Sequence, residues 1–191
     1  PVIHFTLSSS PTDGEIIRIT TRVRPESGFK KTLDELGIGS QLEGDGPYGK
    51  FTLDENEIYQ QVFIAGGIGI TPFRSIVKSV TDRKIQIPLH LIYSNSTPQE
   101  ITFRSELMEL AKINSLFKLD FTISKPEESQ QPWNGLVGRI DEKMIAKLVG
   151  DLTIPKFWVS GPPAMVDAIA ASLKNLPIKE DHIKLERFTG Y

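Results

Sequence analysis

From residue 61 onward, short apolar runs alternate with stretches in which apolar side chains recur every three to four positions. Short runs rich in branched side chains predict buried strands, and the wider spacing predicts helices that cover one face of a sheet. The expected strands are residues 62–65, 88–93, 118–123, 156–160 and about 183–188, and the expected helices are about 72–81, 103–113, 141–149 and 162–174. This alternation predicts an α/β fold with a doubly wound parallel sheet.

Before residue 61, strand-like segments are joined by turn residues rather than by helices. We expect antiparallel strands at 2–7, 15–23 and about 41–45, and one short helix from Lys30 to Leu36. Three strands leave both edges of a sheet open. The sequence therefore predicts a partial antiparallel barrel in residues 1–57, followed by an α/β domain in residues 58–191.

The first residue, Pro1, stands in a strand-like run with no initiator methionine before it. We interpret the chain as a fragment, a processed product, or a chain that lacks its first residues. The remaining strands of the barrel are then expected from outside this sequence or from a partner.

A glycine-rich turn, Gly66–Pro72, joins the first predicted parallel strand to the helix after it. Glycines let a ligand approach the backbone, and a helix start offers unpaired N–H groups to a phosphate. We expect Thr71 to be the N-cap and Pro72 the first helical residue. Pro72 stands where a dinucleotide fingerprint has its third glycine, so a turn that binds no ligand is an equally good interpretation of this motif alone.

Three other predicted strands also end in residues that can bind a ligand. Parallel sheets bind ligands outside the carboxyl ends of their strands, so these segments should share one rim with the glycine turn. They are Ser94–Thr97, Ser124–Pro126 and Ser160–Pro163. Together the four segments favour a nucleotide site over a set of polar loops.

Composition narrows the classes of function. The 191 residues carry a net charge of −2, with a pI near 6.0 and no basic cluster, which argues against nucleic acid as the main partner. No apolar run approaches the roughly 20 residues that span a bilayer, so we expect a cytoplasmic protein. Zero cysteines exclude a disulfide or a cysteine-bound iron–sulfur cluster on these residues. His4, His90 and His182 are too scattered to predict a metal site, and His90 is interpreted as a core residue.

The chain resembles the ferredoxin–NADP reductase-like flavoproteins, which join a flavin-binding β-barrel to an α/β domain that binds a pyridine nucleotide. The similarity covers nearly the whole chain, with six motifs in the family's order. They are His4–Ser9 for the flavin, Ser27–Leu33 for its phosphates, Gly46–Phe51 for a barrel turn, Gly66–Pro72 for the nucleotide phosphates, Ser160–Met165, and Glu186–Phe188 near the end.

On the flavin side, the resemblance implies FAD as cofactor. His4 and Phe5 would contact it, with Phe5 against the isoalloxazine ring, and Thr6 would offer its hydroxyl to flavin N5. The backbone at Thr20, Thr21 and Arg22 would line the flavin chain, and Lys30, Lys31 and Thr32 would meet its pyrophosphate. The family's phosphate-binding arginine is replaced by Ile3, and Lys30 stands where many members have a serine.

On the nucleotide side, the resemblance implies NADH or NADPH. Ser94 and Asn95 would bind the adenosine ribose, and Gly161 and Pro162 would border the nicotinamide. The expected pyrophosphate cradle is Gly66, Gly67, Gly69, Ile70, Thr71 and Pro72, and Met165 completes the expected nucleotide-binding residues. Family members that select NADPH tend to place a serine and a basic residue around the ribose 2′-phosphate. No arginine adjoins the Ser94 turn, and Arg104 and Lys125 are the basic residues that could reach the phosphate. We therefore expect NADH to be preferred.

The implied activity is an FAD-dependent NAD(P)H oxidoreductase that passes a hydride to flavin and then electrons to an unidentified protein or small acceptor. The implied catalytic residues are Thr6, Ser160, Glu186 and Phe188, of which Phe188 would cover the flavin until nicotinamide displaces it. Two alternatives stay open: a nucleotide-binding module without catalysis, and a fragment of a larger reductase that has no functional flavin site by itself.

Overall fold

The computed structural model describes residues 3–23 and 27–188. A six-stranded parallel sheet occupies the second part of the chain, in the order β4-β3-β2-β1-β5-β6. Its strands are β1 (Gln61–Gly66), β2 (Leu89–Asn95), β3 (Phe117–Ile123), β4 (Leu136–Val137), β5 (Lys156–Gly161) and β6 (Ile183–Arg187). The α-helices are α1 (Gly28–Glu35), α2 (Thr71–Asp82), α3 (Arg104–Ile113), α4 (Glu142–Val149) and α5 (Pro163–Lys174). Single turns of 3-10 helix are η1 (Gly67–Ile70), η2 (Pro98–Glu100), η3 (Pro126–Glu128) and η4 (Glu180–His182).

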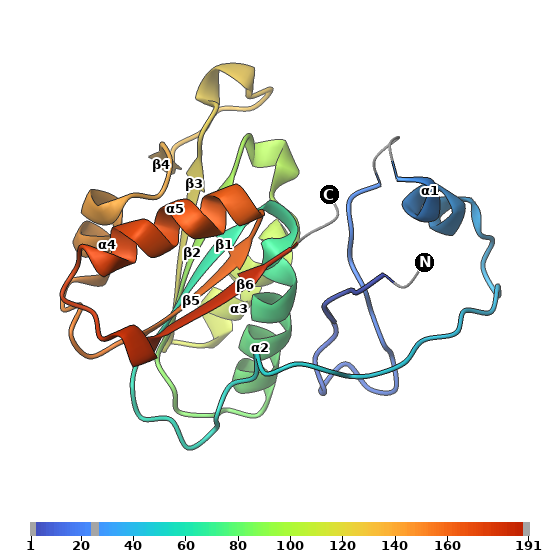
Figure 1. Ribbon diagram of the computed structural model, residues 1–191, viewed down its shortest axis with the longest axis horizontal. Coiled ribbons are helices and arrows are strands. Elements are labelled where there is room, and N and C mark those ends of the chain that lie inside the picture. The colour runs from blue at the N-terminus through green and yellow to red at the C-terminus, as the bar shows by residue number, and fades with distance from the viewer. Residues whose placement is uncertain (1–2, 24–26, 189–191) are drawn as a thin grey trace.

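Helices cover both faces of the sheet, as the alternating pattern predicts (Figure 1). On one face, Phe73 and Val77 of α2 and Leu107 of α3 pack on alternate residues of the central strands. On the other face, Ile145 of α4 and Val166 of α5 pack on the intervening residues. Every residue of β1 is buried because helices cover both sides of it. The predicted α/β fold is therefore confirmed for this part of the chain.

The antiparallel barrel predicted for residues 1–57 is not formed in the described residues. The predicted strands at 15–23 and about 41–45, and the described part of the one at 2–7, are extended segments whose only ladder contact is an isolated bridge between Leu7 and Ile19. A strand needs a neighbour to pair its backbone groups, and residues 41–45 are exposed to solvent throughout. The prediction of strands here was wrong for that reason. Val2, the first residue of the strand predicted at 2–7, and Pro25 and Glu26, which follow the strand predicted at 15–23, lie outside the described residues.

Two local predictions need correction. Thr71 is the first residue of α2 rather than its N-cap, and its hydroxyl donates to the Ile68 carbonyl at 3.3 Å. The 3-10 turn η1 feeds directly into α2, so the helix start needs no side-chain cap. The two-residue strand β4 is absent from the predicted strands, because it is too short to leave a period in the sequence.

His90 is a buried core residue, as predicted, and its Nε2 lies 2.7 Å from Asp120 Oδ2. The predicted helix near Lys30 is also present as α1, and Ser27 caps it by accepting the Lys30 N–H at 3.4 Å. Apart from α1, residues 3–23 and 27–50 are loops on the α2 side of the α/β part, and α1 lies away from the sheet (Figure 1). None of the helices in the described residues has the length and hydropathy needed to cross a membrane.

Candidate functional site

The glycine turn lies at the carboxyl end of β1, in the middle of the sheet. Gly67 has φ +52°, and no heavy atom lies within 4 Å of the position of an added Cβ, so its outer side is open to a ligand. Gly69 is the opposite case, because an added Cβ would lie 2.3 Å from the Ser160 carbonyl oxygen and 2.6 Å from Gly161 Cα. Gly69 therefore lets the turn approach β5, while Gly67 faces outward.

The other residues predicted for this turn pack behind it or are buried within it. An added Cβ on Gly66 would fall 1.9 Å from the Met165 sulfur, so Met165 packs behind the turn. Ile70 and Thr71 are buried, and Pro72 stands in the first turn of α2. These side chains shape the cradle, and its open part is the backbone around Gly67.

A buried tyrosine that the sequence analysis did not identify holds the glycine turn in place through a hydrogen bond. Tyr93 of β2 is fully buried, and its hydroxyl donates to the Gly67 carbonyl at 2.8 Å. The β1–β2 register pairs Ala65 with Tyr93, which brings the ring beneath the turn. A polar-tipped aromatic in a strand adjoining a glycine turn is the signal that could have indicated this role.

Ser160 and Glu186 are brought together at the carboxyl ends of β5 and β6, where they are register partners. The Ser160 hydroxyl is buried and the Glu186 Oε2 atom is buried, and neither has a hydrogen-bond partner in the described part of the chain. Burial raises the pKa of the Glu186 carboxyl. Because buried polar groups normally have partners, two adjacent ones without any point to a ligand that supplies them.

Phe188 and Gly161 complete this edge. The Phe188 N–H donates to the Gly161 carbonyl at 2.9 Å, so the chain after β6 stays beside the end of β5. Pro162 lies between Gly161, the last residue of β5, and the first residue of α5. A shallow hollow lined by Lys50, Phe51, Lys184 and Leu185 opens next to Glu186. The edge thus combines a polar pair, an aromatic residue and open space.

The end of β2 also carries unpartnered polar atoms. Asn95 is 5% exposed, and neither atom of its side-chain amide makes a hydrogen bond of good geometry in the described residues. Ser94 precedes it and is half-buried. Of the two basic side chains considered for a ribose phosphate, Lys125 pairs with Glu128 at 2.8 Å. The Arg104 guanidinium lies 5.4 Å from the Trp133 ring centre, and its buried Nε has no hydrogen-bond partner in the described residues.

The residues predicted for the flavin lie in the loops before β1. Phe5 and Thr6 are half-buried, and the Phe5 and Phe29 rings are 6.1 Å apart, whereas His4 is exposed. Thr20 bonds to the Ser8 hydroxyl at 2.7 Å, and Thr21 beside it is half-buried.

Arg22 reaches across to the α/β part and contacts Glu100 at 2.9 Å. Lys30 is buried on α1, whereas Lys31 and Thr32 are exposed, and the Thr32 hydroxyl donates to the Gly28 carbonyl at 3.0 Å.

The two ligands fit this chain to different degrees. The glycine turn, the open side of Gly67 and the unpartnered atoms of Ser160 and Glu186 fit a pyridine nucleotide on the rim of the sheet. The described residues before β1 do not close a barrel around Phe5 and Thr6, so they do not form a complete flavin site alone. They also hold no group of three or more His, Asp or Glu residues arranged for a metal.

Comparisons with known proteins agree with this geometry. The family described as "Oxidoreductase NAD-binding domain" matches residues 63–171. The glycine betaine monooxygenase reductase subunit of Chromohalobacter salexigens is 28% identical over 185 residues, which cover 96% of this chain and 50% of the relative. NADH-cytochrome b5 reductase 1 of Coccidioides immitis is 30% identical over 191 residues, which cover 95% of this chain and 61% of the relative.

The fold is shared with a solved structure that spans both parts of the chain. Flavohemoglobin from Malassezia yamatoensis, with bound FAD and heme, aligns with a TM-score of 0.81 at 24% identity, covering 96% of this chain and 46% of that one. The chain spans only 50% and 61% of the length of the two curated relatives named above.

Proposed function

The chain belongs to the ferredoxin–NADP reductase-like oxidoreductases and carries their NAD-binding domain, and we propose that it binds NAD(P)H across the carboxyl edge of its sheet for hydride transfer to a flavin. The observation that carries this proposal is the pair formed by the Ser160 hydroxyl and the Glu186 Oε2 atom on adjacent strands beside the glycine turn, both buried and without a hydrogen-bond partner in the described residues. A nicotinamide ring with its carboxamide supplies both a donor and an acceptor for such a pair. The fold alone would not support this function.

In this proposal, backbone N–H groups around Gly67 bind the pyrophosphate, and Ser94 and Asn95 bind the adenosine ribose. Gly161 and Pro162 border the nicotinamide, and Ser160 and Glu186 orient it. Phe188 lies over the hydride-transfer position until the nicotinamide replaces it. The work of these residues is positioning and exclusion of water.

FAD is the proposed hydride acceptor, and it supplies the two-electron chemistry when bound. Phe5 and Thr6 would contact its ring, with His4 beside them. The other proposed flavin contacts are Thr20, Thr21, Arg22, Lys30, Lys31 and Thr32. The relatives are named for different acceptors, so the proposal covers oxidation of NAD(P)H and does not extend to one acceptor.

We propose NADH rather than NADPH as the donor. A 2′-phosphate is best bound by a free basic side chain. Two of the nearby cations are engaged in ion pairs, because Lys125 is paired with Glu128 and Arg22 is paired with Glu100. Fluorescence titration should therefore give a lower Kd for NADH than for NADPH, and the reverse order would contradict this assignment.

A stopped-flow experiment tests the function as a whole. The protein is supplied with FAD and mixed with NADH, and the flavin absorbance is followed; bleaching is expected. Ser160→Ala should slow the bleaching while leaving the Kd of NADH similar, because it removes one orienting group.

A protein that binds NADH and never bleaches flavin would support the second candidate, a nucleotide-binding module. The segments before β1 favour that candidate, because in the described residues they do not form a barrel that would enclose a flavin. A protein that binds no NADH would contradict both.

A further inference from the structure

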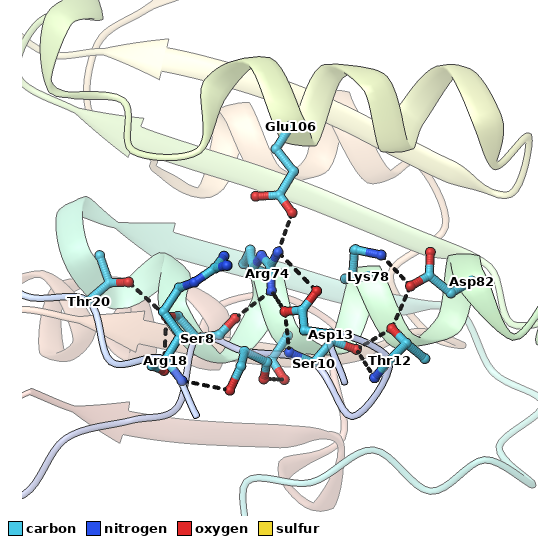
Figure 2. A network of polar contacts seen from close by, with 12 residues as sticks. Ser8, Ser10, Thr12, Asp13, Arg18, Thr20, Arg74, Lys78, Asp82 and Glu106 are labelled. Atoms are coloured by element: carbon cyan, nitrogen blue, oxygen red, sulfur yellow. Dashed lines mark hydrogen bonds and ion pairs between the residues drawn. The ribbon is translucent and has the colours of Figure 1, made fainter. Parts of the chain in front are cut away.

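Arg74 of α2 is a buried cation that neither the glycine turn nor the β5–β6 edge uses. Its residue is 2% exposed, and its guanidinium donates to the Ser8 carbonyl at 2.9 Å and to both oxygens of the Asp13 carboxylate. It also pairs with Glu106 of α3, and Phe103 lies with its ring centre 5.7 Å from the guanidinium carbon. One arginine thus joins two helices of the α/β part to the first loop (Figure 2).

The loop Ser8–Asp13 follows α2 along much of its length. Beyond Arg74, the Ser75 hydroxyl donates to the Ser9 carbonyl at 2.7 Å. Near the other end of the helix, Thr12 donates to the Asp82 carboxylate, which also pairs with Lys78 (Figure 2). Because each of these contacts is a hydrogen bond or ion pair between particular atoms, they fix the position of the loop along the helix. An apolar contact would let the loop shift.

The two ends of this arrangement are parts of the proposed site. Ser8 is two residues after Thr6, which is the proposed flavin contact. Arg74 is three residues after Thr71, where the glycine turn enters α2. The helix therefore links the nucleotide cradle to the flavin segment, and Arg74 is the buried charged side chain in that link.

We infer that Arg74 is a positioning residue, which holds the Phe5–Thr6 segment at a fixed place relative to the nucleotide cradle. The inference rests on the proposed function. Hydride transfer requires reacting atoms held about 3–3.5 Å apart, and a misplacement of about 1 Å can cost roughly a hundredfold in rate. Nucleotide binding needs only the cradle, so the two properties should separate when Arg74 is changed.

Arg74→Lys is the test, because lysine keeps the charge but cannot bond a carbonyl and two carboxylates in a fork. Hydrogen exchange should become roughly tenfold faster or more at the amides of Ser8, Ser10 and Asp13, which are all bonded in the native structure. The rate constant for flavin reduction by NADH should fall about tenfold or more. The Kd of NADH should stay within about twofold of the native value, which a general loss of structure would not allow.

Arg83→Lys is the matched control. Arg83 stands at the end of the same helix and binds both carboxylate oxygens of Glu55, but the pair is exposed. The same substitution there should leave the exchange of the loop, the Kd of NADH and the rate of flavin reduction unchanged. An equal effect in both variants would contradict a specific role for Arg74.

A second variant covers the case in which Arg74→Lys does not fold. Asp13→Asn weakens the same contact from the loop side and leaves the pair between Arg74 and Glu106 in place. Unchanged exchange at Ser8–Asp13 in these variants overturns the inference, and faster exchange with unchanged flavin reduction also overturns it. Native protein that binds no NADH or reduces no flavin would instead be a failure of the proposed function, and the exchange data would still report on the contact itself.

Discussion

Gly69→Ala perturbs the contact between the glycine turn and β5. An added Cβ would lie 2.3 Å from the Ser160 carbonyl oxygen, 2.5 Å from the Ser160 carbonyl carbon and 2.6 Å from Gly161 Cα. All three neighbours are backbone atoms of a central strand, so no side chain can swing away to make room. The turn and the strand must separate by about 1 Å to restore ordinary van der Waals contact.

The size of the effect follows from this geometry. Overpacking in a rigid site costs about 1–3 kcal/mol, and the upper half of the range applies because backbone must move. For a chain of this length, each kcal/mol lowers Tm by about 2–4 °C, so we expect a fall of roughly 4–12 °C. The displaced cradle should weaken NADH binding about tenfold or more, equivalent to roughly 1.4 kcal/mol.

Thermal unfolding followed by circular dichroism and titration of NADH fluorescence measure the two effects. Gly37→Ala is the control, because an added Cβ there meets no atom within 4 Å and the backbone has no positive φ. Its free energy of unfolding should change by no more than about 0.5 kcal/mol, as for an exposed substitution, which corresponds to about 1–2 °C in Tm. If Gly69→Ala unfolds at the native Tm and binds NADH normally, the close approach of turn and strand is not what holds the cradle.

Three further predictions concern other residues. Gly67→Val fills the open side of the cradle, so the Kd of NADH should rise about tenfold or more while the helix signal in circular dichroism is kept; normal affinity would remove Gly67 from the site. Burial raises the pKa of the Glu186 carboxyl, so the native Tm should fall as pH rises from the ordinary value of 4.5 through the raised pKa. Glu186→Gln should remove this fall, and parallel curves of Tm against pH for the two proteins would contradict the prediction. The hydrogen bond from Arg74 lowers the pKa of Asp13 below 3.8, so the loop Ser8–Asp13 should stay protected above that pH and exchange faster as pH falls through the lowered value; Asp13→Asn should show a flatter response after correction for intrinsic exchange.

The α/β part could be predicted from the sequence because its signals are local and agree with one another. The apolar run ending at Gly66 has the composition of a buried strand, and α5 begins at Pro163, one residue after the predicted start. The rim of the sheet followed from the topology rule alone, which brought Ser160 near the glycine turn. Thr71 was misassigned because a 3-10 turn before a helix has no distinct sequence signature.

The first part of the chain could not be predicted in the same way, because strand formation depends on partners. Ile17 and Ile19 have strong β propensity, yet propensity describes how a side chain fits a sheet that already exists. Arg74 was missed for a related reason: its partners, Ser8, Asp13 and Glu106, lie far from it along the chain, so no local pattern joins them. The roles of individual site residues stay predictions.

The position of β1 between β2 and β5 also governs how the chain can fold during synthesis. Gln61 accepts a hydrogen bond from the Trp158 indole, which lies 97 residues later in the sequence. Until β5 has left the ribosome, β1 pairs on one side only, and its buried apolar residues border an open edge. Contacts of such high sequence separation slow folding, and a nascent chain stalled before β5 would present that edge to other chains.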